Sequence, residues 1–368
     1  MSEQLFNPHR LRLARERAGW SIIELAREID VSPRQVSNYE RGASAPSEQA
    51  LQAIVEKLRF PKEFYFRDGA TILRDENATF RSLRRTTAAQ RNQVLALGSL
   101  AMELSNFIEL SFNLPAVDLP DMSDYRRKPE AAADALRALW GLDQKPVANS
   151  IALLEFHGVR VFSLAEELHE VNAVSVWARS RPFVFLNTMK SAEASRFDAM
   201  HELAHLVLHR EESDPREAES EANAFAAAML MPASDVLAVT PSAVTMKTLI
   251  KLKRRWGVSL SALAHRIHEL GIIGPWPYRN LCIEIGRSGY RTNEPNAMDR
   301  ETSRILAKVL AELRNEGVTL THLANALAIP TDELKRLIFG LAIIGVDGGG
   351  GRVAGARKAD RTTNLREV

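Results

Sequence analysis

Residues 198–209 read DAMHELAHLVLH, and the rest of the chain is interpreted outward from this stretch. In a helix, His201 and His205 lie on one face one turn apart, with Glu202 beside them. This is the H-E-x-x-H geometry of zinc hydrolases, in which two neutral imidazoles hold the metal and the glutamate accepts a proton from water. His209 lies roughly 6 Å further along the helix axis than His205, too far for an easy shared ligand. We expect it near the ligands or at the helix end, outside the ligand set.

A catalytic zinc takes three protein ligands, so a third is expected elsewhere. The next helical pattern covers residues 216–232 and reads REAESEANAFAAAMLMP, ending at a proline. Phe225 and Met229 form an apolar row at four-residue steps, and the row extends backwards to Glu221. We therefore predict Glu221 as the third ligand. Glu219, one face away, is the second choice.

Three β-rich runs precede the H-E-x-x-H helix, at residues 158–162, 172–177 and 181–186. The last two are separated by a polar turn and predict a hairpin. Helical patterns over 129–140 and 147–157 come before them, so this region is expected to be α+β. In zinc peptidases an edge strand commonly aligns the substrate by strand addition. The run 181–186 is a candidate for that role, although the sequence leaves open which strand is the edge.

Two segments carry a family resemblance: HELAHLVLH at 201–209, and the helix with ESEANAFA at 219–226 and LMP at 230–232. Together, residues of about 128–240 resemble the ImmA/IrrE family of metallopeptidases, gluzincin-like proteases that cleave a repressor. The resemblance implies Zn²⁺ as the cofactor and Glu202 as the general base. It also implies three zinc ligands, which are His201, His205 and Glu221.

Residues 7–66 form a run of short helical patterns with compact connections. Ser21 caps one helix and is followed three residues later by Glu24, a capping-box arrangement. Ser32 caps the next helix, with Pro33 at its first position, where the missing N–H costs nothing. Helix, short turn and capped helix are what a helix-turn-helix DNA reader requires.

The second of these helices presents hydrogen-bond donors at its outward positions, suited to base edges or phosphates. These positions are Arg34, Gln35, Ser37 and Asn38. The run VSPRQVSNYERG at 31–42 resembles the XRE family of Cro/repressor-type domains, and the likeness covers residues 8–66. It implies double-stranded operator DNA as a partner and a fold-supporting role for Glu40. The alternative is a protein-interaction module, because helix-turn-helix folds are sometimes recruited for that.

The composition of the chain limits the number of domains and the kinds of site that it can contain. The chain has 368 residues, 45% of them hydrophobic, which is enough for two or three domains with their own cores. Its formal net charge is +2, so a surface for nucleic acid must be local. The single cysteine, Cys282, excludes a disulfide framework and a cysteine-rich zinc site. No signal peptide is evident, and residues 94–114, the most apolar run, read as an amphipathic helix rather than a membrane span. We expect a cytoplasmic protein.

The segment between the two family-like regions is basic at its start. Residues 77–102 contain no Asp or Glu, and four arginines cluster there: Arg81, Arg84, Arg85 and Arg91. They are suited to contacting phosphates, or they are simply a solvated helix start. A helix over about 87–113 is expected to follow and to end at Leu114-Pro115.

The C-terminal region repeats the apolar frame of the N-terminal one. Residues 21–42 align without a gap over residues 319–340, and small or apolar residues coincide. The presumed second helix of the copy starts with Asp332 and Glu333, which would face phosphate. We therefore predict a helix-turn-helix-like interaction module there, not a second DNA reader. His265 and His268, in the helical stretch 244–270, are expected in surface or packing roles.

The sequence thus predicts a multidomain, predominantly α protein. The expected parts are an all-α DNA-binding domain at 1–68, a helical linker at 69–127, an α+β zincin-like domain at 128–240, an all-α region at 241–346 and a disordered tail at 347–368. The expected function is a DNA-binding transcriptional regulator, acting as a homodimer, with a zinc-dependent endopeptidase domain that cleaves a repressor or another regulatory protein. The alternative is a transcription factor whose peptidase-like domain senses a ligand or partner without catalysis.

Overall fold

The three-dimensional structure is a computed structural model that describes residues 5–68, 73, 87–164, 168, 170–178, 180–210, 214–342 and 363–364. The fold over these residues is predominantly α-helical with one small three-stranded sheet, as predicted. The predicted disordered tail, 347–368, lies outside the described residues except for β5 (Thr363–Asn364), which pairs with β1 (Phe112–Asn113).

The N-terminal domain has the predicted succession of short helices. They are α1 (Pro8–Arg17), α2 (Ile22–Glu28), α3 (Pro33–Glu40), α4 (Glu48–Leu58) and the 3₁₀ helix η1 (Lys62–Phe66). Ser21 caps α2 in a full capping box with Glu24, and Ser32 caps α3 with Gln35. Glu40 accepts two hydrogen bonds from Arg15, of 2.6 and 2.8 Å, which ties α3 to α1. Glu40 therefore supports the fold, as the family resemblance implied.

The N-terminal domain packs through α1 against a single long helix, α5 (Ala88–Ser111). Arg10 of α1 forms a buried ion pair of 2.6 Å with Glu103 of α5. By length and composition α5 also qualifies as a membrane span, as do α9 and α10 if they are taken together across their 55° bend. However, 67% of the apolar window of α5 is buried inside the fold, as in the core helix of a globular protein.

The sheet lies beside α5 and contains β2 (Arg160–Ser163), β3 (Ala173–Ala178) and β4 (Arg181–Leu186) in the order β2-β4-β3. β3 and β4 form the predicted antiparallel hairpin, and β2 runs parallel to β4. The run 181–186, the candidate for the edge strand, is the central strand, because β2 pairs on the other side of β4. Among the described residues, β2 and β3 are the outer strands.

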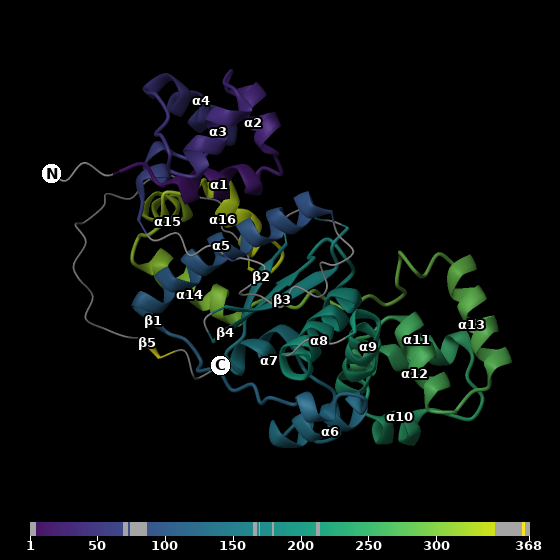
Figure 1. Ribbon diagram of the computed structural model, residues 1–368. Coiled ribbons are helices and arrows are strands. Elements are labelled where there is room, and N and C mark those ends of the chain that lie inside the picture. The colour runs from purple at the N-terminus through teal and green to yellow at the C-terminus, as the bar shows by residue number, and fades with distance from the viewer. Residues whose placement is uncertain are drawn as a thin grey trace.

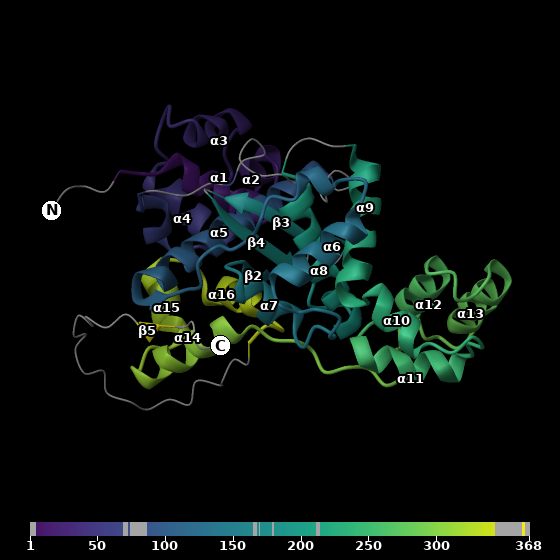
Figure 2. The ribbon, with the colours of Figure 1, turned by 90° about the horizontal axis from the view of Figure 1, so that it is seen from below.

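Helices cover the sheet and form the layer that holds the site. They are α6 (Pro129–Leu139), α7 (Ser150–Phe156), α8 (Ala192–Leu208), α9 (Pro215–Leu230) and α10 (Ala233–Val239), with the 3₁₀ turn η4 (Ser123–Tyr125). α8 carries the H-E-x-x-H motif, and it packs on β3 and β4 with one side and on α9 with another. α8 and α9 lie side by side in both views (Figures 1 and 2).

The remaining helices form two groups. α11 (Met246–Trp256), α12 (Leu260–Glu269) and α13 (Pro275–Arg287) project at one end of the molecule, whereas α14 (Arg304–Asn315), α15 (Leu320–Leu327) and α16 (Thr331–Ile338) lie near α5 (Figure 1). The chain between the groups is anchored by buried Lys253, whose ammonium lies 2.8 Å from Glu193 and 3.1 Å from Glu294. Beyond this anchor the chain runs to α14, α15 and α16, which contact the N-terminal domain through Glu333 and Ala326.

Candidate metal centre

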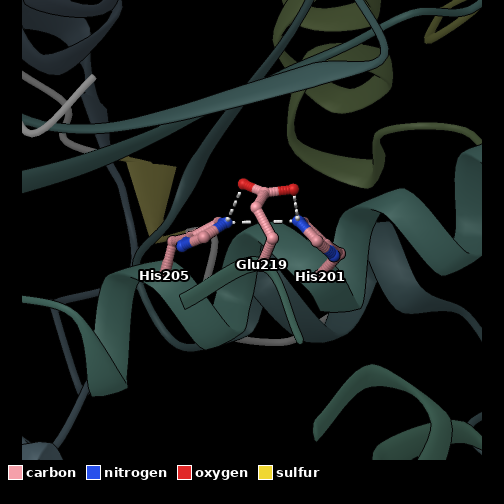
Figure 3. A group of neighbouring side chains, drawn as sticks. All are labelled: His201, His205 and Glu219. Carbon is pink, nitrogen blue, oxygen red and sulfur yellow. Dashed lines mark hydrogen bonds and ion pairs between the residues drawn. The ribbon is translucent and has the colours of Figure 1, made fainter. Parts of the chain in front are cut away.

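The two histidines of the motif face one another at one turn's separation on α8. Ser191 caps the start of α8, and the backbone N–H of His209 bonds to the carbonyl of His205 at its end. The Nε2 atoms of His201 and His205 are 3.1 Å apart (Figure 3). Both rings thus point their Nε2 lone pairs into one small space, as two ligands of a single ion must.

Glu219 of α9 is the carboxylate that completes this group. Its Oε1 lies 3.5 Å from Nε2 of His205, and its Oε2 lies 3.7 Å from Nε2 of His201 (Figure 3). Tetrahedral ligands about 2.0–2.1 Å from a zinc ion are separated from each other by roughly 3.3 Å. The three side chains therefore fit a metal ion in both chemistry and spacing, and they are the group in the described part of the chain able to hold one.

The predicted third ligand, Glu221, takes a different position. Its Oε2 lies 2.8 Å from Nε2 of His209, and its Oε1 accepts the backbone N–H of Arg127 at 2.9 Å. The apolar row that singled out Glu221 leads into the core, whereas the metal group sits where α8 and α9 meet near the surface. A polar pattern would have found the nearer carboxylate. Glu219 and Asn223, four residues apart, share the face of α9 that contacts the histidines.

Hydrogen bonds at Nδ1 orient both ligand histidines. Nδ1 of His201 lies 3.1 Å from Oδ1 of Asn223, an acceptor, so this nitrogen carries the proton and Nε2 keeps its lone pair. Nδ1 of His205 lies 2.9 Å from Nδ1 of His209. If His205 donates there, His209 must donate from Nε2 to Glu221. The chain Glu221–His209–His205 is therefore an outer support of the kind that orients metal-bound histidines.

Glu202 is buried behind the histidines, with 2% of its surface exposed. The hydroxyl of Ser175 on β3 donates to Oε2 of Glu202 at 2.6 Å. Burial raises the pKa of Glu202 to about 7, the range that a general base needs at neutral pH. Burial and the neighbouring His205 lower the pKa of His201 to about 4, which keeps its ring neutral, as a metal ligand must be.

Strand β3 lies directly against the site helix. The indole N–H of Trp177 donates to the carbonyl of Leu206 at 3.1 Å, and the guanidinium of Arg210 lies 4.6 Å from the ring centre of Trp177. Ser175 adds its bond to Glu202 from the same strand. Sequence reasoning missed Ser175, because only strand register brings it to the motif.

The predicted DNA-contacting residues lie together on α3. Arg34 and Gln35 are exposed, and Ser37 and Asn38 are half-buried. Oε1 of Gln35 accepts the backbone N–H of Ser32 at 2.9 Å. Oδ1 of Asn38 accepts a bond of 2.8 Å from Arg41, a further exposed cation at this surface that sequence reasoning did not select.

Two other groups of sequence candidates lie away from the metal centre. His268 stacks on Tyr278 and its Nδ1 lies 3.0 Å from the carbonyl of Ile273, while Nε2 of His265 lies 3.2 Å from Glu269. These are the packing and surface roles expected of them. Of the basic cluster in the connecting segment, Arg91 lies in the first turn of α5, and Arg81, Arg84 and Arg85 lie outside the described residues.

Comparisons with protein families give two matches. Residues 11–64 match the helix-turn-helix family model, and residues 154–268 match the model of the IrrE N-terminal-like domain, a peptidase family. They support the fusion of an XRE-type helix-turn-helix domain with an ImmA/IrrE-like domain. No curated protein is significantly similar to the chain. A helix-turn-helix domain suggests a DNA-binding regulator located where DNA is, in the cytoplasm or the nucleoid.

Proposed function

We propose that this protein is a DNA-binding transcriptional regulator with a zinc-dependent endopeptidase site. The observation that carries the proposal is the convergence of His201, His205 and Glu219 at the ligand spacing of one ion, beside a buried Glu202. A digestive enzyme has no need of a DNA reader, so we propose that the cleaved substrate is a repressor or another regulatory protein.

Each residue of the site has a defined part in peptide hydrolysis. His201, His205 and Glu219 would hold the zinc, and His209 and Glu221 would keep the ring of His205 in its orientation. A bound zinc would supply a Lewis acid that polarises the scissile carbonyl and acidifies water. Glu202 accepts the proton of the attacking water and passes it to the leaving amine, while Ser175 holds its carboxylate in place.

Strand β3 is the surface that we propose for the substrate. It is an outer strand of the sheet among the described residues, and it lies against α8 next to the metal centre. An extended peptide adding to this strand would form main-chain hydrogen bonds and lie along the site helix. The preferred substrate is therefore an extended or locally unfolded segment.

Metal analysis separates the two candidate third ligands. Purified protein is expected to bind one zinc per chain, measured by competition with a chromogenic chelator. Glu219→Gln should lose a ligand and most of the affinity, whereas Glu221→Gln should lose only about 10–100-fold, the usual cost of an outer-sphere partner. If Glu221→Gln has the larger effect, Glu221 is the ligand; if the wild type binds no zinc, the metal site is refuted.

Cleavage is tested separately with a defined probe. Zinc-loaded protein is incubated with a proteome-derived peptide library, and new termini are identified by mass spectrometry. Wild type should generate them, and Glu202→Gln should keep the zinc but generate none, because only the proton acceptor is removed. Zinc binding without cleavage would instead favour a domain that senses a ligand or partner.

The DNA-binding part has its own test. Arg34→Ala and Asn38→Ala should each weaken operator binding, by about 1–3 kcal/mol if the residue contacts a base edge. The operator is first selected from a random duplex pool with the wild-type protein, and zinc content serves as the control that should not change. Unaltered binding would remove these residues from the interface. Sedimentation of the selected complex tests the predicted homodimer.

A further inference from the structure

The C-terminal helices resemble the N-terminal helix-turn-helix domain, residues 8–66, in backbone conformation as well as in sequence. We call the N-terminal domain the reader and the C-terminal segment the copy. The copy lies 298 residues further along the chain, from residue 21 to residue 319. At that offset, three positions have a positive φ in both copies. The pairs are Gly19 and Gly317 (75° and 75°), Asp30 and Ala328 (52° and 53°), and Gly42 and Gly340 (71° and 69°). Three coincidences in the rare left-handed region indicate one backbone design used twice.

Capping and core packing agree with the repeat. Thr319 caps α15 in a capping box with His322, as Ser21 caps α2 with Glu24. Leu334 of α16 is 1% exposed and takes the place of Val36 of α3, which is fully buried. α14 precedes the pair as α1 precedes α2. We call α14–α16 the C-terminal repeat.

The surface of the copy differs from that of the reader at the DNA-contacting positions. Arg34, Gln35, Ser37 and Asn38 correspond in order to Asp332, Glu333, Lys335 and Arg336. Gln35 is exposed on the reader, whereas Glu333 is only 6% exposed. A carboxylate buried at this position needs a partner of opposite charge, and it repels a phosphate backbone.

Glu333 binds Arg336 of its own helix through Oε1 and the reader through Oε2. Nε of Arg17, at the end of α1, lies 2.6 Å from Oε2 of Glu333, and the side chains are 3% and 8% exposed. A second contact lies nearby, where a guanidinium nitrogen of Arg67 donates to the carbonyl of Ala326 at 2.7 Å. α16 corresponds in position to α3, the predicted DNA-contacting helix. In the C-terminal repeat this helix therefore packs against the reader.

The same repeat also joins the peptidase-like sheet. α16 packs against β2, and Gly340, just after α16, lies against Thr188, which follows β4. A Cβ added at Gly340 would come within 2.8 Å of the Thr188 side chain. In Figure 1, α16 lies next to α1, the helix that ends at Arg17. The outward face of α3 is not used in these contacts.

We propose that the C-terminal repeat is a protein-docking module whose partner is the N-terminal DNA-binding domain of the same chain. It binds the end of α1 through Glu333 and holds the reader against the sheet of β2, β4 and β3. The outward face of α3 remains accessible to DNA. The inference concerns the assembly of the chain and stands whether or not the metal centre cleaves peptides.

A mutant cycle in the full-length protein tests this contact. The variants are Arg17→Met, Glu333→Met and the double substitution, with hydrogen–deuterium exchange of the α1 amides as the readout. Each single change breaks the buried ion pair between the two copies, while Arg336 remains bound to Glu333 in Arg17→Met, so exchange of the α1 amides should be at least about 10-fold faster. The double change removes both charges and should exchange more slowly than either single variant, because the two effects are coupled.

Glu312→Met is the matched control, since Glu312 is an exposed glutamate on α14 of the same module. It should leave α1 unchanged. Glu333→Met should also leave the core amides of α4 protected, which separates undocking from unfolding of the reader. The proposal is overturned if Glu333→Met leaves the exchange of α1 at the wild-type rate, or if the two single effects simply add.

Discussion

The two helix-turn-helix units of this chain share a backbone and differ in what their second helix faces. In the reader, α3 exposes Arg34 and Gln35, and in the C-terminal repeat, α16 buries Glu333 against the reader. The buried apolar positions and positive-φ residues coincide, so the frame depends on features that both copies keep. Function depends on the few outward side chains that they do not share. The same backbone arrangement can therefore bind either DNA or protein, and the charge on the outward face of its second helix decides which.

The largest effect is expected from giving the reader the acids of the copy. Arg34→Asp with Gln35→Glu should reduce binding to the selected operator about 10³-fold at low salt, because two acids would face phosphate. Glu at position 35 can still form the capping box with Ser32, so α3 should stay folded. The measurement is fluorescence anisotropy, with circular dichroism as the control. Unchanged binding to the operator would show that the charge of this face does not decide between DNA and protein.

A core position of the copy is expected to have the next largest effect. Leu334→Ala should lower the free energy of unfolding by about 3 kcal/mol, because it removes buried side-chain volume from α16. The neighbouring Lys335→Ala, on the exposed side, should change it by less than about 0.5 kcal/mol. Urea unfolding followed by circular dichroism gives both values. Equal effects would mean that α16 is not packed as described.

The close approach of the repeat to the sheet is tested by two glycines with similar backbones. Gly340→Ala places a Cβ against Thr188 and should cost about 2 kcal/mol, from backbone strain and contact together. Gly317→Ala has the same strain, but no atom lies within 4 Å of its added Cβ, so it should cost about 1 kcal/mol. The difference between the two unfolding free energies measures the contact with the sheet. If the two substitutions lower the free energy of unfolding equally, the C-terminal repeat does not contact the sheet at Gly340.

The smallest effect concerns how the first helix of the repeat is attached. Glu155 of α7 accepts hydrogen bonds from the hydroxyl of Ser303 and from the backbone N–H groups of Arg304 and Ile305, at the start of α14. Burial raises the pKa of Glu155 to about 7, above its value in an unfolded chain. The folded state therefore binds the proton more tightly, and this contribution to stability is lost as pH rises through about 7.

We expect the free energy of unfolding to fall by about 1–2 kcal/mol between pH 5 and 7, given that one pKa unit corresponds to about 1.4 kcal/mol. Glu155→Gln should remove that part of the pH dependence. α1 of the reader is capped by Asn7, which does not titrate, so the same substitution strategy has no counterpart there. An unchanged pH profile in Glu155→Gln would assign the dependence to other groups.

Local patterns accounted for much of the fold. The helix caps at Ser21 and Ser32, the hairpin of β3 and β4, and α8 were predictable because their signals lie within a few residues of the element. The order of the sheet was not, because the pairing of β2 with β4 joins strands that are separated in sequence. The choice of Glu221 as third ligand stays a prediction: apolar periodicity finds the buried face of α9, whereas Glu219, the carboxylate that lies with both histidines, is on the boundary of that face.

The sequence by itself determined the two family-like segments, the His201-Glu202-x-x-His205 spacing and the repeated helix-turn-helix frame, because each is written in residue types at short, regular intervals. Tertiary structure decided which carboxylate meets the histidines, that Ser175 meets Glu202, and that Glu333 finds Arg17. These contacts join residues far apart along the chain. Their geometry depends on how helices and strands pack, which no local pattern encodes.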